Sequence, residues 1–245
     1  MPPLDLTFLQ RLPWLQSRRH CQLCDETTDH PTHSICTACE SELPWLGAHC
    51  QICAVPLPAH GMICGACQNK PPSFTRVEAP WRYAFPVDNL ITRFKHQARW
   101  PYGRLLGERL AHHLEHAFAE GLPRPDLLLP VPLARRRLRQ RGFNQAQMLA
   151  DWLSRPLGIA TDARALERVL DTPAQQQLDA ATRRRNLRQA FAIATGADVK
   201  GRHLALVDDV LTTGATAEAL ARLLKRAGAE RVDVYCLART PKPGE

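Results

Sequence analysis

Two adjacent acids followed by a hydroxyl-rich turn are the residues of this 245-residue chain that most directly suggest chemistry. The apolar run Leu204–Val207 leads into Asp208 and Asp209, and the segment Thr212–Thr216 follows. Ligands of open α/β sheets bind beyond the carboxyl ends of the strands, where the first N–H groups of a helix can hold a phosphate. The carboxylates can accept hydrogen bonds from sugar hydroxyls and help to hold a hydrated magnesium ion. A capped helix with two solvated acids is the alternative interpretation.

The order of strand, acid pair, Thr-Gly-x-Thr and helix resembles the 5-phosphoribosyl-diphosphate (PRPP) motif of type I phosphoribosyltransferases. In that motif the acid pair contacts the ribose hydroxyls and the loop holds the 5′-phosphate. The resemblance implies that Asp208 and Asp209 orient the ribose, and that the phosphate is bound by Thr212, Thr213, Gly214, Ala215 and Thr216. Purine-salvage members carry an acid at the position of Thr212, so the acceptor is not expected to be a purine that is deprotonated in that way.

Eight of the nine cysteines form four pairs with two residues between the thiols: Cys21 and Cys24, Cys36 and Cys39, Cys50 and Cys53, and Cys64 and Cys67. A two-residue gap lets one turn present both sulfurs to one ion, and zinc prefers tetrahedral thiolate sites. The pattern therefore predicts two structural zinc ions, with disulfides or an iron–sulfur cluster as alternatives. We expect the first four cysteines on one ion and the last four on the other, although an interleaved arrangement is also open. Cys236 is expected to be a buried core thiol.

The charge is unevenly distributed along the chain, whose net charge is +8. Residues 1–70 hold four Lys and Arg against six Asp and Glu, while the rest holds 28 against 18. This basic excess favours a phosphate-bearing ligand, with ordinary solubility charge as the alternative. The sequence has neither an export leader nor about 18 consecutive apolar residues, so we expect a cytoplasmic protein without membrane insertion. Thiols stay reduced in the cytoplasm, which supports metal binding.

The apolar pattern predicts three segments: an N-terminal helix at 1–20, a cysteine module at 21–72, and an α/β domain at 73–245. In the last segment we expect a helix, or a helix and a turn, at 90–120, and further helices at 143–153 and 215–227. We expect strands at 126–131, 203–207 and 231–238. Alternation of this kind indicates a largely parallel sheet with flanking helices. The predicted fold class is thus a type I phosphoribosyltransferase-like α/β domain, preceded by a small zinc-binding module.

Together with the four cysteine pairs and the acid turn, the segment Leu129–Leu133 and the run Arg139–Ala146 make the chain resemble the ComF family. The match covers nearly the full length. The resemblance implies a zinc-finger head on a phosphoribosyltransferase-like domain that binds PRPP with magnesium. It also implies an association with natural competence, with incoming single-stranded DNA and with proteins of the competence machinery.

The family pattern implies three further contributions to the site. The loop of Val131, Pro132, Leu133, Ala134 and Arg135 is expected to receive the diphosphate, with Arg135 stabilising the departing charge. Lys95 is expected to contact a phosphate. The polar segment 171–188 resembles the loop that closes over PRPP, with Gln177, Arg183, Arg184 and Arg185 in it, although a plain surface loop is the alternative.

These observations predict a phosphoribosyltransferase with an unknown acceptor. Two alternatives use the same fold without transfer. The chain could bind single strands as a DNA-uptake factor, with Trp81, Tyr83, Phe94 and Trp100 available for base stacking unless they lie in the core. It could instead sense PRPP without turnover.

Overall fold

The computed structural model describes residues 20–29, 34–170 and 189–241, which form two compact units, Met1–Leu43 and Pro44–Glu245. The division lies between the second and the third cysteine pair, whereas the sequence indicates a boundary near residue 72. Each unit therefore holds one set of four cysteines. The helix expected at 1–20 lies outside the described residues, apart from its last position.

The described part of the first unit consists of turns and one short helix. The N–H of Asp25 donates to the carbonyl of Cys21 at 2.9 Å, which closes the first cysteine turn. Helix α1 (Thr37–Ser41) begins directly after Cys36 and contains Cys39, and the N–H of Thr37 donates to Asp29 Oδ1 at 2.9 Å. Because α1 buries no residue, this part has too small an apolar core to explain its own fold.

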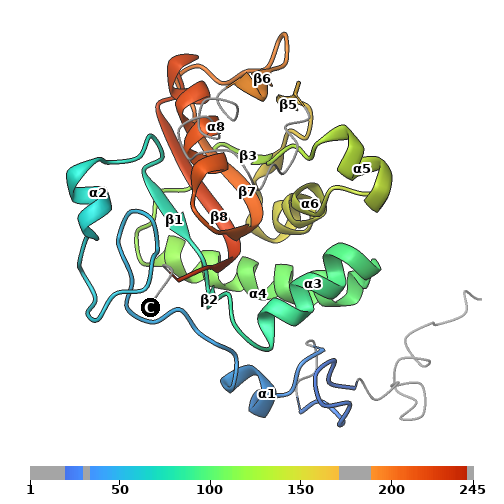
Figure 1. Ribbon diagram of the computed structural model, residues 1–245. Coiled ribbons are helices and arrows are strands. Elements are labelled where there is room, and N and C mark those ends of the chain that lie inside the picture. Colours follow the sequence, from blue (N-terminus) through green and yellow to red (C-terminus); the bar gives the residue numbers. More distant parts are fainter. Residues whose placement is uncertain (1–19, 30–33, 171–188, 242–245) are drawn as a thin grey trace, which may run out of the picture. The chain divides into compact units, whose positions relative to one another are not determined.

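A parallel sheet forms the centre of the second unit (Figure 1). Among the described residues its strand order is β1-β8-β7-β3-β4, with β2 also paired to β8. The strands are β1 (Arg76–Glu78), β2 (Trp81–Arg82), β3 (Leu127–Pro130), β4 (Ala160–Thr161), β7 (His203–Leu211) and β8 (Arg231–Arg239). All pairings in this sheet are parallel. The central strands are nearly continuous apolar runs because both of their faces are covered.

Helices α3 (Val87–Gln97), α4 (Trp100–Ala119) and α6 (Gln145–Leu157) lie on one side of the sheet, and α8 (Ala215–Arg226) lies on the other (Figure 1). The parallel sheet with flanking helices confirms the predicted fold class. The region expected to be helical at 90–120 is two helices, because α3 ends at Ala98 in a left-handed conformation (φ 51°). The two helices pack closely: a Cβ on Gly103 would lie 2.6 Å from the ring of Phe94.

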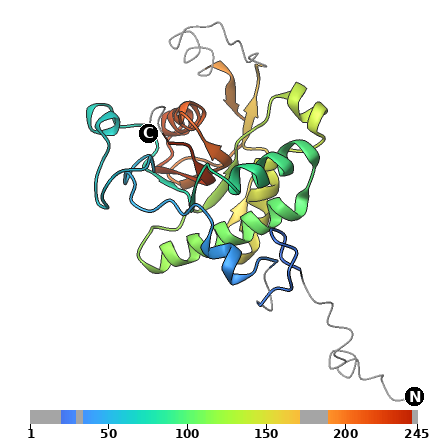
Figure 2. The same ribbon diagram turned by 60° about the horizontal axis from the view of Figure 1, so that its bottom comes forward.

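Three smaller elements complete the described part of the second unit. Helix α2 (Gly65–Asn69) begins directly after Cys64 and contains Cys67, and α5 (Arg135–Arg141) follows β3. Strands β5 (Leu166–Arg168) and β6 (Phe191–Ile193) form a separate antiparallel ribbon that projects from the body in Figure 2. The residues between them include the predicted closing loop at 171–188, with Gln177 and the three arginines, which lies outside the described residues.

The segment that precedes and carries the third cysteine pair belongs to the core of the second unit. Leu46 and Ala54 are buried in the same apolar cluster as Leu206 of β7 and Leu220 of α8. Backbone hydrogen bonds extend this packing, since the N–H of Leu46 donates to the carbonyl of Pro80 at 2.8 Å. The second cysteine set is therefore built into the α/β domain.

Candidate functional site

The acid pair lies near the carboxyl end of β7, as the sequence predicts. Asp208 Oδ1 accepts from the N–H of Asp209 at 2.9 Å, and Asp209 Oδ1 accepts from the N–H of Val210 at 2.8 Å. The Asp209 side chain is buried, and Asp208 is partly exposed. Burial raises the pKa of Asp208 to about 6, against the opposing effect of the positive charge of Lys95. At neutral pH both a free carboxylate oxygen and negative charge are available here for a hydroxyl or a cation.

Lys95 joins the acid pair from a distant part of the chain. It lies in the last turn of α3, and its Nζ is 2.6 Å from Asp209 Oδ2. Burial lowers the pKa of Lys95 to about 8, although Asp208 partly offsets this effect. The ammonium group of Lys95 is already partly desolvated. It can therefore exchange its contact with Asp209 for one with an incoming phosphate at a small further desolvation cost. The structure thus brings together the cation and the two acids that the sequence indicates separately.

The turn after β7 presents backbone donors at the start of α8. Gly214 is the residue before the helix and takes a left-handed conformation (φ 74°), which favours glycine. Gly214 itself offers no side-chain cap, so the first-turn N–H groups of α8 beyond that of Ala215 can meet a ligand. Thr212 and Thr213 are exposed, and Thr213 Oγ1 accepts from the N–H of Ala215 at 3.4 Å. Such a turn has the donors and the helix dipole that a phosphate requires.

The predicted diphosphate loop begins beside the acid pair. Pro130 of β3 is in register with Val207 of β7, and the N–H of Val131 donates to the carbonyl of Val207 at 2.9 Å. Asn144, at the start of α6, donates from Nδ2 to the carbonyl of Val131 at 3.0 Å and holds this end of the loop. Because β3 and β7 are parallel neighbours, their following loops emerge at the same edge of the sheet. Arg135 is exposed in the first turn of α5.

A basic pocket of about 630 Å³ lies between the end of α3 and α5. Its lining consists of Lys95, His96, Gln97, Ala98, Arg137, Gln140, Arg141 and Phe143. Burial lowers the pKa of His96, and the neighbouring charges of Arg141 and Lys95 lower it further. The pocket therefore favours an anionic occupant.

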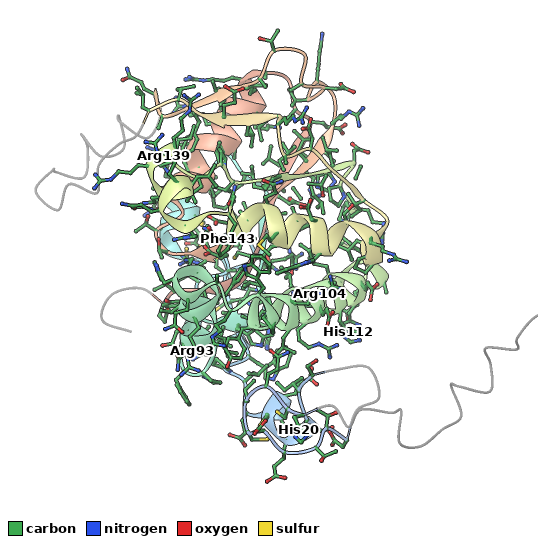
Figure 3. All side chains as sticks on the ribbon, turned by 90° about the vertical axis from the view of Figure 1, so that its right-hand side faces the viewer. His20, Arg93, Arg104, His112, Arg139 and Phe143 are labelled. Atoms are coloured by element: carbon green, nitrogen blue, oxygen red, sulfur yellow. The ribbon has the colours of Figure 1, made fainter. Side chains whose placement is uncertain are left out.

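The sequence did not single out Gln140 or Phe143 as site residues. The available signal was the four-residue spacing of Arg137 and Arg141, which places both on one face of a helix. Arg139, on the same helix, extends away from the body in Figure 3.

The aromatic residues considered for base stacking divide between core and surface. Trp81 and Phe94 are fully buried, whereas Trp100 is 53% exposed. Phe143 contacts both: its ring centroid is 5.7 Å from that of buried Phe94 and 6.3 Å from that of exposed Trp100, edge to face in the second case. Trp100 and Phe143 therefore add aromatic surface next to the basic pocket. Cys236 is fully buried in β8, as expected of a core thiol.

The eight paired cysteines form two groups in sequential order, Cys21, Cys24, Cys36 and Cys39, and Cys50, Cys53, Cys64 and Cys67. Within each group all Sγ atoms lie within 4.8 Å of one another, with 3.8 Å between Cys24 and Cys36 and 3.7 Å between Cys53 and Cys64. With Zn–S bonds of about 2.3 Å, neighbouring sulfurs of a tetrahedron lie about 3.8 Å apart. Both groups thus fit zinc, and all nine cysteines are free of disulfides.

Comparisons with known proteins place these features in a family. A model described as a double zinc ribbon domain matches residues 12–68, and one described as a phosphoribosyl transferase domain matches residues 139–245. DNA utilization protein YhgH of Escherichia coli (strain K12) is 38% identical over 221 residues, which cover 90% of this chain and 96% of that protein. Competence protein F of Haemophilus influenzae is 34% identical over 221 residues, covering 89% and 96%. The chain belongs to the ComF family.

The similarity to ComF proteins extends to competence protein ComFC of Bacillus subtilis, which is 26% identical over 249 residues and covers 90% of this chain and 95% of that protein. Among solved structures, adenine phosphoribosyltransferase from Saccharomyces cerevisiae aligns with 59% of this chain and 72% of its own at 18% identity, with a TM-score of 0.38.

This ComF chain thus combines a double zinc ribbon, whose two cysteine groups support structural zinc, with a phosphoribosyltransferase domain. The ribbon match crosses the boundary at Leu43 and Pro44, so its two halves belong to different compact units. None of the helices in the described ranges has the length and apolar character that crossing a bilayer requires.

Proposed function

We propose that the phosphoribosyltransferase domain binds PRPP together with magnesium. Asp208 and Asp209 bind the ribose hydroxyls, and the turn from Thr212 to Thr216 binds the 5′-phosphate. The diphosphate is bound by Lys95 and by the loop from Val131 to Arg135.

The observation that carries this proposal is the position of Lys95. Its Nζ lies 2.6 Å from Asp209 Oδ2, at the edge of the sheet where the loops after β3 and β7 emerge. An acid pair beside one partly buried lysine is suited to a ligand that carries both hydroxyls and phosphates. The hydroxyls donate to the carboxylates, and the lysine is drawn from the acid to the phosphate oxygens.

In the proposed reaction the bond between C1′ and the diphosphate breaks, and the bonding electron pair leaves with the diphosphate. The acceptor then forms a new bond to C1′. Magnesium carried by PRPP neutralises charge on the diphosphate. The protein contributes position and electrostatics: the acid pair orients the ribose, and Lys95 and Arg135 stabilise the leaving group. The proposal does not specify the chemical identity of the acceptor. A PRPP sensor would use the same contacts without releasing diphosphate.

Calorimetric titration of PRPP with magnesium tests the proposal. We expect micromolar binding by the wild type, and a loss of roughly tenfold or more in Asp208→Asn and Asp209→Asn, because each removes a charged acceptor. Asp151→Asn, on the exposed face of α6, is the matched control and should bind like the wild type. Unchanged affinity in both site variants, with their fold intact by circular dichroism, would contradict the assignment. Release of diphosphate in the presence of candidate acceptors separates an enzyme from a sensor.

A second candidate function is binding of single-stranded DNA next to the same pocket. Its support is the combination of an exposed aromatic, Trp100, with Phe143 and the basic lining of the pocket. Stacking on aromatic rings beside cations is how proteins bind single strands without sequence preference. We expect Trp100→Leu to weaken binding of oligothymidine by about tenfold or more, and binding to fall steeply with salt. Phe85→Leu, at a residue that is 75% exposed, is the control.

We also propose the eight paired cysteines as the ligands of two structural zinc ions. Elemental analysis of the purified protein should give two zinc ions per chain, falling to one when either group loses a cysteine. A content unaffected by such substitutions would contradict the ligand assignment.

A further inference from the structure

Arg239, the last residue of β8, is a buried arginine whose partners are backbone carbonyls. Its side chain is 7% exposed. Nε donates to the carbonyl of Cys53 at 2.8 Å. Nη1 donates to the carbonyls of Leu211 at 3.0 Å, Thr212 at 2.5 Å and Thr240 at 2.6 Å. A single guanidinium therefore connects a cysteine turn with the segment that follows β7.

One end of this connection belongs to the second cysteine group. Cys53 Sγ lies 3.7 Å from Cys64 Sγ, and the turn is closed by the N–H of Ala54, which donates to the carbonyl of Cys50 at 2.9 Å. Ala54 is fully buried in the core of the domain. The direction of the Cys53 carbonyl thus depends on the turn that a metal ion would hold closed through the thiols of Cys50 and Cys53.

The other end lies at the start of the proposed phosphate loop. The carbonyl and the N–H of a trans peptide unit point in opposite directions. Carbonyls of Leu211 and Thr212 that are directed at Arg239 therefore direct the N–H groups of Thr212 and Thr213 to the opposite side of the chain. The side chains of both threonines are exposed. Arg239 in this way orients donors that a phosphate can meet.

We propose that Arg239 is a positioning residue that links the second cysteine group to the phosphate-binding loop. The proposal rests on the proposed function, and it makes PRPP affinity depend on metal in the second group. The first group, which belongs to the other compact unit, has no such role. The fork of an arginine is essential to the link, because its donors reach both segments at once, whereas the single ammonium of a lysine cannot reproduce this geometry.

The test uses the full-length protein and the variants Arg239→Lys and Arg239→Gln. Arg231→Lys is the matched control, because it changes an arginine at the opposite end of the same strand, where Nε binds Asp233 at 3.0 Å. Calorimetry with PRPP and magnesium should show about tenfold weaker binding in both Arg239 variants and wild-type binding in the control. Zinc content should stay at two ions per chain before any chelator is added.

A second readout does not depend on PRPP. Zinc release to the chelator 4-(2-pyridylazo)resorcinol should show one of the two ions leaving about tenfold faster in Arg239→Gln than in the wild type. Saturating PRPP should lower the share of that ion that the chelator takes at equilibrium from the wild type but not from Arg239→Gln, because coupling between the binding free energies of two sites is reciprocal.

The outcomes separate the two proposals. Wild-type binding of PRPP with equal binding by folded Arg239→Lys and Arg239→Gln would overturn the link and leave the proposed function standing. Absence of PRPP binding in the wild type would overturn the proposed function and the role of Arg239 in PRPP binding. In that case unchanged zinc release in Arg239→Gln would also overturn the connection between the cysteine turn and the loop.

Discussion

The two cysteine groups have the same ligand spacing within each pair and different surroundings. In the first group Cys24 is exposed, and helix α1, which contains Cys39, buries no residue. In the second group Cys50, Cys64 and Cys67 are buried and pack with Val55 into a small apolar cluster. The difference arises from the residues next to the thiols, because those of the second group are apolar and reach the core of the α/β domain. Two cysteine motifs with the same spacing can therefore stabilise either a local turn or an entire domain.

The largest effect should come from removing one thiol from each group in turn. A structural zinc ion contributes on the order of 10 kcal/mol to the folding of its site. Cys53→Ser should therefore destabilise the α/β domain by several kcal/mol and lower its thermal unfolding temperature, because its cysteine turn is part of that domain. Cys24→Ser should leave that transition in place. Scanning calorimetry compares the main unfolding temperature of the two variants, each of which has lost one zinc ion. Equal effects on the main transition would contradict the division into two environments.

A smaller effect should come from the apolar residues around each group. Leu46→Ala should destabilise the α/β domain by about 3 kcal/mol, because it leaves a cavity in the core shared with Leu206 and Leu220. Ile35→Ala removes a side chain that is equally buried, at 1% exposure against 3% for Leu46, but from the first unit. Its effect on the unfolding of the α/β domain should be under about 0.5 kcal/mol. Urea unfolding followed by far-ultraviolet circular dichroism measures both.

The smallest effect concerns the ligand site alone and should leave both cysteine groups unchanged. The pKa of Lys95 is lowered to about 8, so its positive charge is present at pH 7 and is lost as the pH rises through 8. PRPP affinity should therefore fall by about threefold or more between pH 7 and 9. Lys95→Arg keeps its charge over this range and should remove that fall, while zinc content stays constant in both proteins. A persistent alkaline decline in Lys95→Arg would assign it to another group.

Several elements of the fold could be predicted because their signals are local. The apolar run before Asp208 and the glycine-containing turn after it indicate a strand, a phosphate-type turn and a helix within one short segment. The observed β7 and α8 follow that order. The two sequential cysteine groups also follow from short spacings. The break between α3 and α4 was less visible, because it depends on the left-handed conformation of Ala98, a residue with no strong preference for it.

The sequence by itself determined which segments carry chemistry: the cysteine pairs, the acid turn and the loop from Val131 to Arg135. Those patterns depend on residues a few positions apart, whose geometry is set by local turns and helices. Only the tertiary structure decided that Lys95 meets Asp209 and that Arg239 meets the carbonyl of Cys53. It also decided that the second cysteine group belongs to the α/β domain. The contacts of Lys95 with Asp209 and of Arg239 with Cys53 join residues more than a hundred positions apart. The packing of the sheet determines which of these residues meet, and no local sequence pattern predicts that packing.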